Sequence, residues 1–385
     1  MPQYLAPGVY VEEVASSVQP IAGAGTSIAG FIGEVADDVV MPSKPGSSTD
    51  FYTVAPAGVP RLITSWESFK NHFGDFQEDD DSILAHAVYG FFNNGGTRCW
   101  VTRLSTIDAT TVTNALGAFE AIDEIALVVV PGATDPAIQN QIVGHCEKMG
   151  DRFAILDGHE TDQFTAANIQ GGTQRNNHAA MYFPRIEVAD SFSVTGRRFV
   201  PPSGHIAGIY ARIDTERGVH KAPANAVVRG ALGVEHRLSR ADQEGLNPAG
   251  INVIRDLNGN FVVWGARTLG GDANGEWKYI NVRRLFLFLR ESIDEGTQWA
   301  VFEPNDTALW AKITRNVTAF LTNVWRSGAL FGTTPAEAFY VRCDASTNPP
   351  EVRDLGQVVT EIGVAVVRPA EFVIFRLSQW AGSGK

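Results

Sequence analysis

The chain has 385 residues, of which 44% are hydrophobic and 10% aromatic, which allows roughly two or three folded domains with a sizeable core. Its formal net charge of −12 argues against broad nucleic-acid binding, because that requires a basic surface. Cys99, Cys146 and Cys343 are far apart and odd in number, which disfavours a zinc site or a disulfide framework and indicates a reducing compartment. No stretch approaches the roughly 20 apolar residues that span a membrane, and the first residues lack a signal-peptide pattern, so no direct membrane insertion is expected.

The segment 1–15 predicts an extended strand. Pro2 and Pro7 disfavour a helix, and the segment contains no Lys or Arg. Chain ends usually fray unless something holds them, so we predict that this strand joins a sheet of a neighbouring subunit. The candidate strand residues are Val9, Tyr10, Val11, Glu12 and Glu13.

Residues 22–105 predict a first folded part. Gly, Ala, Ser and Thr are frequent at its start, and prolines recur over 36–60, which indicates a loop. Two apolar helical patterns follow, each with good N-cap residues before it and a glycine after it. The predicted elements are a strand over 28–33, a helix from 64 or 65 to 74, a helix from 81 or 82 to 92, and a strand over 97–104.

Residues 106–249 alternate strands and helices as α/β folds do. Continuous apolar runs over 125–130 and 153–156 flank a helical pattern over 136–150. Such a βαβ unit predicts parallel strands with a right-handed crossover. Further elements expected in this region are a strand over 179–183 and a helix over 203–213, which follows two prolines.

The C-terminal third mixes helices and strands. The pair Asn258 and Gly259 predicts a hairpin turn within 250–263, because both residue types accept left-handed backbone. The clearest helical pattern covers 306–327, with Asn305 as its N-cap and a glycine as its stop. A helix over 282–291 and strands over 358–367 and 372–380 complete the expected elements.

The last predicted strand has apolar side chains on both faces, and a bend at Arg368 and Pro369 precedes it. A strand of this kind is prone to aggregate when its edge is exposed. We therefore predict that it pairs with arms of adjacent subunits. Its residues are Phe372, Val373, Ile374, Phe375, Arg376 and Leu377.

Several separate segments, in this order, resemble the tail sheath proteins of contractile phages and of phage-derived contractile injection systems. The resemblance extends nearly from end to end, and the extracellular injection-system sheaths are the most similar. The segments are 4–14 (YLAPGVYVEEV), 25–33 (GTSIAGFIG), 90–100 (GFFNNGGTRCW), 201–212 (PPSGHIAGIYAR), 301–306 (VFEPND) and 368–376 (RPAEFVIFR).

The resemblance implies a multi-part subunit of mixed α/β and α+β class. Its middle domain would have an α/β fold likened to that of subtilisin, its core would be α+β, and its N- and C-terminal β-arms would be exchanged between subunits. The expected divisions are an N-terminal arm (1–21), the N-terminal part of the core (22–105), the middle domain (106–249), the C-terminal core domain (250–368) and a C-terminal arm (369–385).

The resemblance also implies a structural function. Sheath subunits form stacked hexameric rings, wound as a helix around an inner tube, and contraction drives the tube through a target envelope. The implied partners are other copies of the chain, the inner tube protein, and baseplate and terminal cap proteins, with no nucleic acid. Such particles assemble in the bacterial cytoplasm and belong to a phage tail or tail-like particle, which is released by lysis or retained.

In this family the long helix of the C-terminal domain lies toward the inner tube. We therefore predict tube contacts from the polar face of the 306–327 helix. The candidate residues are Lys312, Arg315 and Asn316.

Ser27 is a candidate catalytic serine, because the segment 25–29 (GTSIA) resembles the segment around the catalytic serine of subtilisin-like proteases. Ser27, however, precedes every histidine of the chain and lies outside the region likened to subtilisin. The glycines at 23 and 25 lack the Gly-Lys-Ser/Thr of a phosphate loop. We therefore expect no catalytic residues and no cofactor.

No metal site is expected either. The acidic run 79–81 lacks the spaced ligands of a calcium loop, and it suits the start of a helix. The spacing of His205, His220 and His236 fits no compact ligand set, so structural roles are expected. The pair Arg283–Arg284 is either part of a positive surface for a partner or a set of solvated helix charges.

Other classes of function remain open at the level of sequence. One is a hydrolase-like enzyme with a degenerate subtilisin-like site, and another is a shell or surface-layer protein that polymerises without contracting. The sequence does not separate a phage sheath from that of a headless injection system, although the short length favours the latter.

Overall fold

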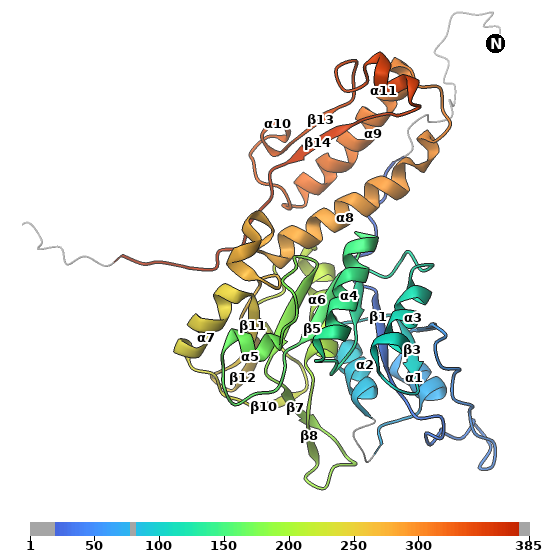
Figure 1. The fold of residues 1–385 in the computed structure, drawn as a ribbon, viewed down its shortest axis with the longest axis vertical. Coiled ribbons are helices and arrows are strands. Elements are labelled where there is room, and N and C mark those ends of the chain that lie inside the picture. The colour runs from blue at the N-terminus through green and yellow to red at the C-terminus, as the bar shows by residue number, and fades with distance from the viewer. Residues whose placement is uncertain (1–19, 78–81, 377–385) are drawn as a thin grey trace, which may run out of the picture.

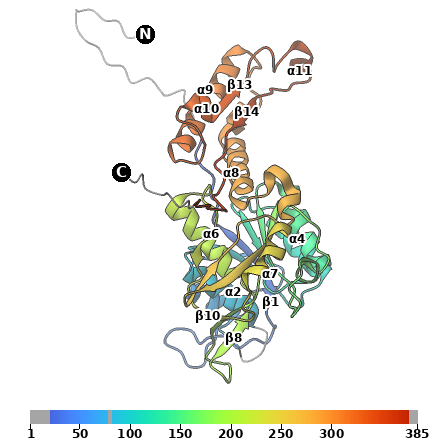
Figure 2. The same ribbon diagram turned by 90° about the vertical axis from the view of Figure 1, so that its left-hand side faces the viewer.

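The computed structural model describes residues 20–77 and 82–376. Figure 1 shows a sheet-containing body and a smaller C-terminal domain, joined by helix α8 (Ile280–Thr297). Figure 2 shows the same arrangement from the side, with α8 leading from the body to the C-terminal domain.

The body is built on one nine-stranded sheet with the order β2-β3-β1-β4-β5-β6-β11-β12-β9. The strands from β3 to β11 are parallel, as the βαβ pattern predicts. Strand β2 pairs antiparallel with β3 at one end of the sheet, and antiparallel pairings add β12 and then β9 at the other end. The strands are β1 (Ala29–Glu34), β2 (Arg61–Ile63), β3 (Cys99–Leu104), β4 (Leu127–Val129), β5 (Phe153–Asp157), β6 (Ala179–Phe183), β9 (Ala226–Val227), β11 (Ile251–Leu257) and β12 (Asn260–Val263).

This sheet crosses two of the predicted divisions. Its strands β1 to β3 come before residue 106, and β11 and β12 come after residue 249. Strand β1 pairs with both β3 and β4, so the first folded part and the middle domain share one layer. The changes of composition along the chain mark loops, whereas the sheet is completed by strands distant in sequence.

Helices cover both faces of the sheet. Alternate strand residues point to opposite faces, so Phe31 and Ile32 belong to different hydrophobic cores. This double coverage explains why the central strands are continuously apolar. One core includes α1 (Trp66–Phe73), α2 (Ile83–Asn93) and α6 (Ser203–Arg217), and the other includes α3 (Ala109–Phe119), α4 (Pro136–Met149), α5 (Ala166–Gln170) and α7 (Arg240–Leu246).

Helix α3 was not predicted, although its start carries a local signal. The Asp108 carboxylate accepts hydrogen bonds from the Thr110 and Thr111 amides, and the Thr111 hydroxyl accepts one from the Asp108 amide. This capping box starts the helix. Its eleven residues include three threonines, one asparagine and one glycine, which are weak helix formers, so the helical pattern is inconspicuous in the sequence.

Helices α2 and α6 approach each other closely. A Cβ atom on Gly204 would lie 2.4 Å from the backbone of Ala87, and one on Gly90 would lie 2.3 Å from the His205 ring. His205 is buried in this contact, and burial, with the nearby His86, lowers its pKa to about 3. The neutral imidazole is thus a packing element, in agreement with the structural role expected for it.

The predicted hairpin turn is confirmed. Asn258 and Gly259 connect β11 to β12 with φ values of 55° and 82°, the left-handed conformation that this turn requires. A separate three-stranded sheet consists of β7 (Ile186–Ala189), β8 (Arg197–Val200) and β10 (Ala231–Val234). The short 3₁₀ helices are η2 (Asn247–Ala249), η3 (Gly271–Trp277) and η4 (Gln298–Ala300).

The C-terminal domain has its own core, formed by α8, α9 and a two-stranded sheet. Helix α9 starts one residue later than predicted: the Asp306 carboxylate caps it, while the Asn305 side chain accepts a hydrogen bond from the Trp310 indole. The elements are α9 (Thr307–Arg326), α10 (Pro335–Ala338), β13 (Phe339–Arg342), α11 (Pro350–Asp354) and β14 (Glu361–Val364).

A buried ion pair fastens α8 to the body. The Arg284 guanidinium lies 2.6 Å and 2.9 Å from the two carboxylate oxygens of Asp214 on α6, and it lies over the Tyr210 ring. Arg284 is therefore not part of a positive surface. Its neighbour Arg283 lies over the Trp277 ring. The three cysteines are free and buried.

Candidate intersubunit site

The predicted N-terminal strand, 9–13, lies outside the described residues. Residues 21–26, which attach this arm to the body and are here called its root, are well defined. Ile21 is buried against Gly296 of α8, and the Ala24 amide donates a hydrogen bond of 2.9 Å to the Ser292 hydroxyl of the same helix. The Thr26 hydroxyl donates to Asp214 and its carbonyl accepts from Arg284. The chain from residue 21 to 26 is thus held along α8.

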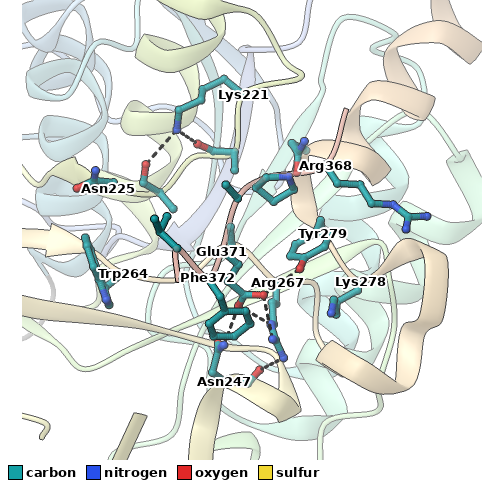
Figure 3. Close-up of a pocket in the computed structure, with 18 of the residues that line it drawn as sticks. Lys221, Asn225, Asn247, Trp264, Arg267, Lys278, Tyr279, Arg368, Glu371 and Phe372 are labelled. Carbon is teal, nitrogen blue, oxygen red and sulfur yellow. Dashed lines mark hydrogen bonds and ion pairs between the residues drawn. The ribbon is translucent and has the colours of Figure 1, made fainter. Parts of the chain in front are cut away.

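The root of the C-terminal arm is a clamp around the Glu371 carboxylate (Figure 3). Arg267 donates two hydrogen bonds, one to each carboxylate oxygen, at 2.8 Å and 2.9 Å. The Asn247 amide donates a third at 2.7 Å, and the Tyr279 hydroxyl donates a fourth at 2.9 Å. Such a bidentate arginine contact fixes both the position and the plane of the carboxylate.

Electrostatics favours the charged form of the clamp. Burial disfavours the Glu371 charge, but the hydrogen bonds from Arg267, Asn247 and Tyr279 outweigh this effect and lower the pKa of Glu371. Burial likewise disfavours the Arg267 charge, and the hydrogen bond and charge of Glu371 outweigh it, so the pKa of Arg267 is raised. Within the fold the pair stays ionised near neutral pH.

The arm leaves the body after Glu371 and not at Arg368 and Pro369, where the bend was predicted. The Asn281 side chain donates a hydrogen bond of 3.2 Å to the Val367 carbonyl, so residues 368 to 370 lie between two fixed points. Asn281 lies in the first turn of α8, and Tyr279 is the N-cap residue of this helix. The contacts of these two residues therefore attach the C-terminal arm to the start of α8.

Beyond Glu371, residues 372–376 pair with no strand of the described chain. Residues 372–376 form no regular secondary structure, so the predicted strand over 372–380 is absent from the described part of this single chain. Phe372, Val373, Ile374 and Phe375 are 69–83% exposed. Figure 1 shows this segment extending away from the body. Residue Leu377 lies outside the described residues.

A cleft with a volume of about 1280 Å³ lies beside the clamp (Figure 3). Lys221 and Trp264 line it from the body, and Phe372 lines it from the arm, so the arm forms one wall of the cleft.

We expect the clamp to weaken in acid. Because the folded chain lowers the pKa of Glu371, the clamp stabilises the fold above the ordinary glutamate range, about pH 4, and loses this contribution as the pH falls through the lowered value. At pH 7, Glu371→Gln should lower the melting temperature by about 2–4 °C. The difference between wild type and variant should shrink below about pH 4.

Glu244→Gln is the matched control, because the Glu244 ion pair with Arg240 is exposed to solvent. It should leave the melting temperature unchanged at both pH values. A difference between wild type and Glu371→Gln that is the same at pH 7 and in acid would contradict an ionised clamp.

Strands β13 and β14 form a sheet open at both edges within the described residues. They pair antiparallel, from Phe339 opposite Val364 to Arg342 opposite Glu361. Phe339 is buried toward the core of the domain, whereas Tyr340 is 59% exposed. A two-stranded sheet of this size has little stability of its own, and its free edges can accept further strands.

The residues predicted to contact an inner tube differ in exposure. Arg315 is exposed and Lys312 is half-buried, but Asn316 is only 3% exposed and cannot contact a partner as placed. Asn316 lies one helical turn from Ile313 and one from Phe320, and both of these side chains face the core. A polar residue type at this spacing was misread as part of the polar face.

Other candidate sites are weaker. Within residues 20–77 and 82–376, no three His, Cys, Asp or Glu side chains come together as metal ligands do. The acidic run 79–81 lies outside the described residues. His236 stacks on Phe183, away from the environment of His205. No helix in the described part of the chain is both long and apolar enough to cross a membrane.

Comparison with known proteins identifies the family. Residues 106–269 match the family model of the phage tail sheath protein central domain, and residues 272–379 match that of the phage tail sheath C-terminal domain. Together these segments make up more than half of the chain. The chain belongs to the phage tail sheath family.

Solved sheath structures of injection systems are similar over nearly the whole chain. A chain of the anti-feeding prophage baseplate, in its 6-fold symmetrised cryo-EM structure, has a TM-score of 0.77 and 31% identity, and the match covers 98% of this chain and 99% of that one. The PVC sheath complex in the contracted state has a TM-score of 0.78 and 30% identity, with 99% of each chain covered.

Sequence relatives include longer proteins. The prophage major tail sheath protein of Pseudomonas aeruginosa strain UCBPP-PA14 is 29% identical over 267 residues, which are 66% of this chain and 65% of the relative. The tail sheath protein of Vibrio phage KVP40 is 31% identical over 182 residues, 46% of this chain and 26% of the relative. The chain thus spans less than two thirds of the length of these curated relatives.

Proposed function

We propose that the chain is the structural subunit of a contractile sheath, which polymerises helically around an inner tube and contracts to drive that tube through a cell envelope. The observation that carries the proposal is the C-terminal arm. It leaves the body at Glu371 with four exposed apolar side chains and no partner, while the β13–β14 sheet of the same chain has open edges. In a polymer, the exposed arm of one subunit can pair with an open sheet edge of another.

In this proposal, adjacent subunits exchange their arms by strand addition. Main-chain pairing gives a link that tolerates changes of side chain. Both arm roots are attached to α8, the N-terminal one through Ser292 and Gly296 and the C-terminal one through Tyr279 and Asn281. Tension on one arm therefore passes to the other through a single helix of about 27 Å, estimated at 1.5 Å per residue.

Contraction is then a rearrangement of bodies around persistent links. The extended sheath is a kinetically trapped state, and new contacts between bodies release its free energy without nucleotide hydrolysis. The clamp fixes the arm at residue 371, so that a body can turn about this point while its arm stays paired. Likeness to a sheath in the contracted state supports this reading.

The proposed partners are other copies of the chain in hexameric rings, an inner tube, and baseplate and cap proteins. Likeness to a chain of a 6-fold symmetrised baseplate structure supports the ring. Lys312 and Arg315 remain the candidates for tube contact, since both reach the surface of α9. The parallel strands with helices on both faces support a subtilisin-like fold for the middle region. We place assembly in the bacterial cytoplasm.

The alternative classes have less support. A hydrolase needs a nucleophile beside a base. Within the described ranges, no hydrogen bond joins a serine hydroxyl to a histidine ring. The buried Ser203 hydroxyl instead donates to Asp157, 2.6 Å away, and so fixes the start of α6 against the end of β5. A non-contracting shell protein would share the open edges, and only its assemblies distinguish it.

Electron microscopy of the purified protein tests the proposal. We expect tubes with a wide lumen, which shorten and widen between an extended and a contracted form. Flat sheets would indicate a surface-layer protein, and discrete particles with hydrolytic activity would indicate an enzyme. Either result would exclude the sheath function.

A further inference from the structure

The cleft beside the clamp is rich in cations, although the chain as a whole is acidic. Seven of its lining residues are Lys or Arg and three are Asp or Glu, whereas the whole chain has 31 Lys and Arg and 43 Asp and Glu. Each of the three carboxylates has a cation partner within the cleft. These ion pairs are Glu244–Arg240, Asp272–Lys278 and Glu371–Arg267. The other four cations form no ion pair within residues 20–77 and 82–376, and they are Arg217, Lys221, Arg255 and Arg368.

Positive groups crowd together at one end of the cleft. Burial and the charge of Arg217 lower the pKa of both His220 and Lys221. The Lys221 ammonium donates hydrogen bonds of 2.6 Å and 3.2 Å to the carbonyl oxygens of Ala222 and Ala224, which do not neutralise its charge (Figure 3). An anion bound between these groups would relieve their repulsion.

Arg255 brings a poorly satisfied guanidinium to the same cleft. It is half-buried, and it donates one hydrogen bond of 3.3 Å to the Gln243 side chain. Its Nε atom is buried without a hydrogen-bond partner in the described part of the chain. Because buried donors are normally satisfied, a guanidinium with so few partners is suited to bind an anion that enters the cleft. Trp264, which is 40% exposed, adds an aromatic ring to the lining (Figure 3).

The chemistry of the lining fits a chain of phosphates. Arginine binds phosphate oxygens through parallel N–H groups, and lysine binds them as a point charge. The four cations come from the end of α6, from β11 and from the segment that leads into the arm, so a ligand that bridges them must carry several charges. The cleft lies between α7, the segment 217–225 and the arm, and such a concave site admits a compact anion more readily than the surface of a folded protein.

We propose that this cleft binds an oligophosphate, either free or as the triphosphate of a nucleotide. The bound anion contacts the body through Arg217, Lys221 and Arg255, and the arm segment 368–373 through Arg368. It therefore joins the body to the root of the arm, next to the Glu371 clamp. The sheath function does not require this ligand, so failure of the site leaves that function standing.

Isothermal titration calorimetry of the full chain tests the site, with sodium tripolyphosphate as the probe at constant ionic strength. We expect saturable binding of one tripolyphosphate per chain. Arg217→Ala, and Lys221→Met, which keeps the stem and removes the charge, should each weaken binding about threefold to tenfold. Arg353→Ala is the matched control, because Arg353 is exposed on α11 outside the cleft, and it should bind as the wild type does. Absence of saturable binding, or an equal loss in all three variants, would overturn the proposal.

ATP distinguishes the two sources of the phosphate chain. An affinity for ATP no higher than that for tripolyphosphate indicates a free oligophosphate. Tighter binding of ATP, with the difference abolished by Trp264→Ala, indicates a nucleotide whose base stacks on the indole. A polyglutamate peptide that binds while neither phosphate does would show that the occupant is an acidic polypeptide, and would overturn the proposal.

A fluorescent label on the arm tests whether the site reaches it. Phe372 lines the cleft, so a polarity-sensitive fluorophore on Phe372→Cys should change its emission as tripolyphosphate saturates the chain. The same label on Val40→Cys, which is 73% exposed on the loop before β2, should not respond. The three native cysteines are buried and should stay unlabelled. The same response from both positions, or from neither, would contradict a site that includes the arm.

Discussion

Deletion of residues 1–15 should leave a folded monomer that no longer forms tubes. The root from Ile21 to Thr26 remains attached to α8 in this variant, and both hydrophobic cores of the body are formed by later residues. The loss is therefore confined to the link between subunits. We expect an unchanged, cooperative thermal melt by circular dichroism and a fall of at least about a hundredfold in sedimentable tubes, because each subunit repeats the missing contact.

A single substitution separates backbone pairing from side-chain packing in the same arm. Val11→Pro removes one amide donor from the predicted strand and should impair assembly strongly. Val11→Ala keeps the donor and should impair it only mildly. Loss of cooperative unfolding in the deleted monomer would show that the segment belongs to the core of its own chain.

A cysteine pair with one member in 9–13 and the other in 372–377 should crosslink different subunits in both extended and contracted tubes. In the proposed exchange the two arms of adjacent subunits lie in one sheet, and the proposal has contraction turn the bodies without separating the arms. We expect covalent ladders of similar intensity before and after contraction, measured by electrophoresis of oxidised particles. Tubes that are crosslinked while extended should still contract.

Val40 provides the control position for this experiment. It is 73% exposed on the long loop before β2, and Figure 1 shows this loop at the end of the body remote from the C-terminal domain. Val11→Cys with Val40→Cys should give no ladders in either state. Ladders that disappear on contraction would overturn the idea of a persistent link, and crosslinks confined to single chains would overturn arm exchange itself.

The clamp divides the C-terminal arm into two parts with different tasks. Glu371 is held by Arg267, Asn247 and Tyr279 on its own body. The described residues that follow, 372–376, form no strand with their own chain, and in the proposed link they pair with a neighbouring subunit. A fixed root sets the direction of the arm, and in the proposed sheath the body turns about this root.

Local signals in the sequence were sufficient for many elements. The Asn258–Gly259 turn, the apolar period of α9 and the start of α1 at Ser65 depend on a few neighbouring residues, because caps and tight turns are made by side chains close in sequence. The βαβ pattern likewise predicted parallel pairing of β4 with β5. The same local signals were ambiguous where two candidates adjoin, as for Asn305 and Asp306.

The sequence by itself determined the family and the parallel α/β character of the body, whereas the exchange of the two terminal strands stays a prediction. The tertiary structure alone decided that one sheet joins β1 to both β3 and β4, that Arg284 is buried against Asp214, and that Asn316 faces a core. It also placed the exit of the arm at Glu371, through partners more than ninety residues away in the chain. These features depend on contacts between distant segments, and side-chain burial follows from which elements pack together, which no local pattern encodes.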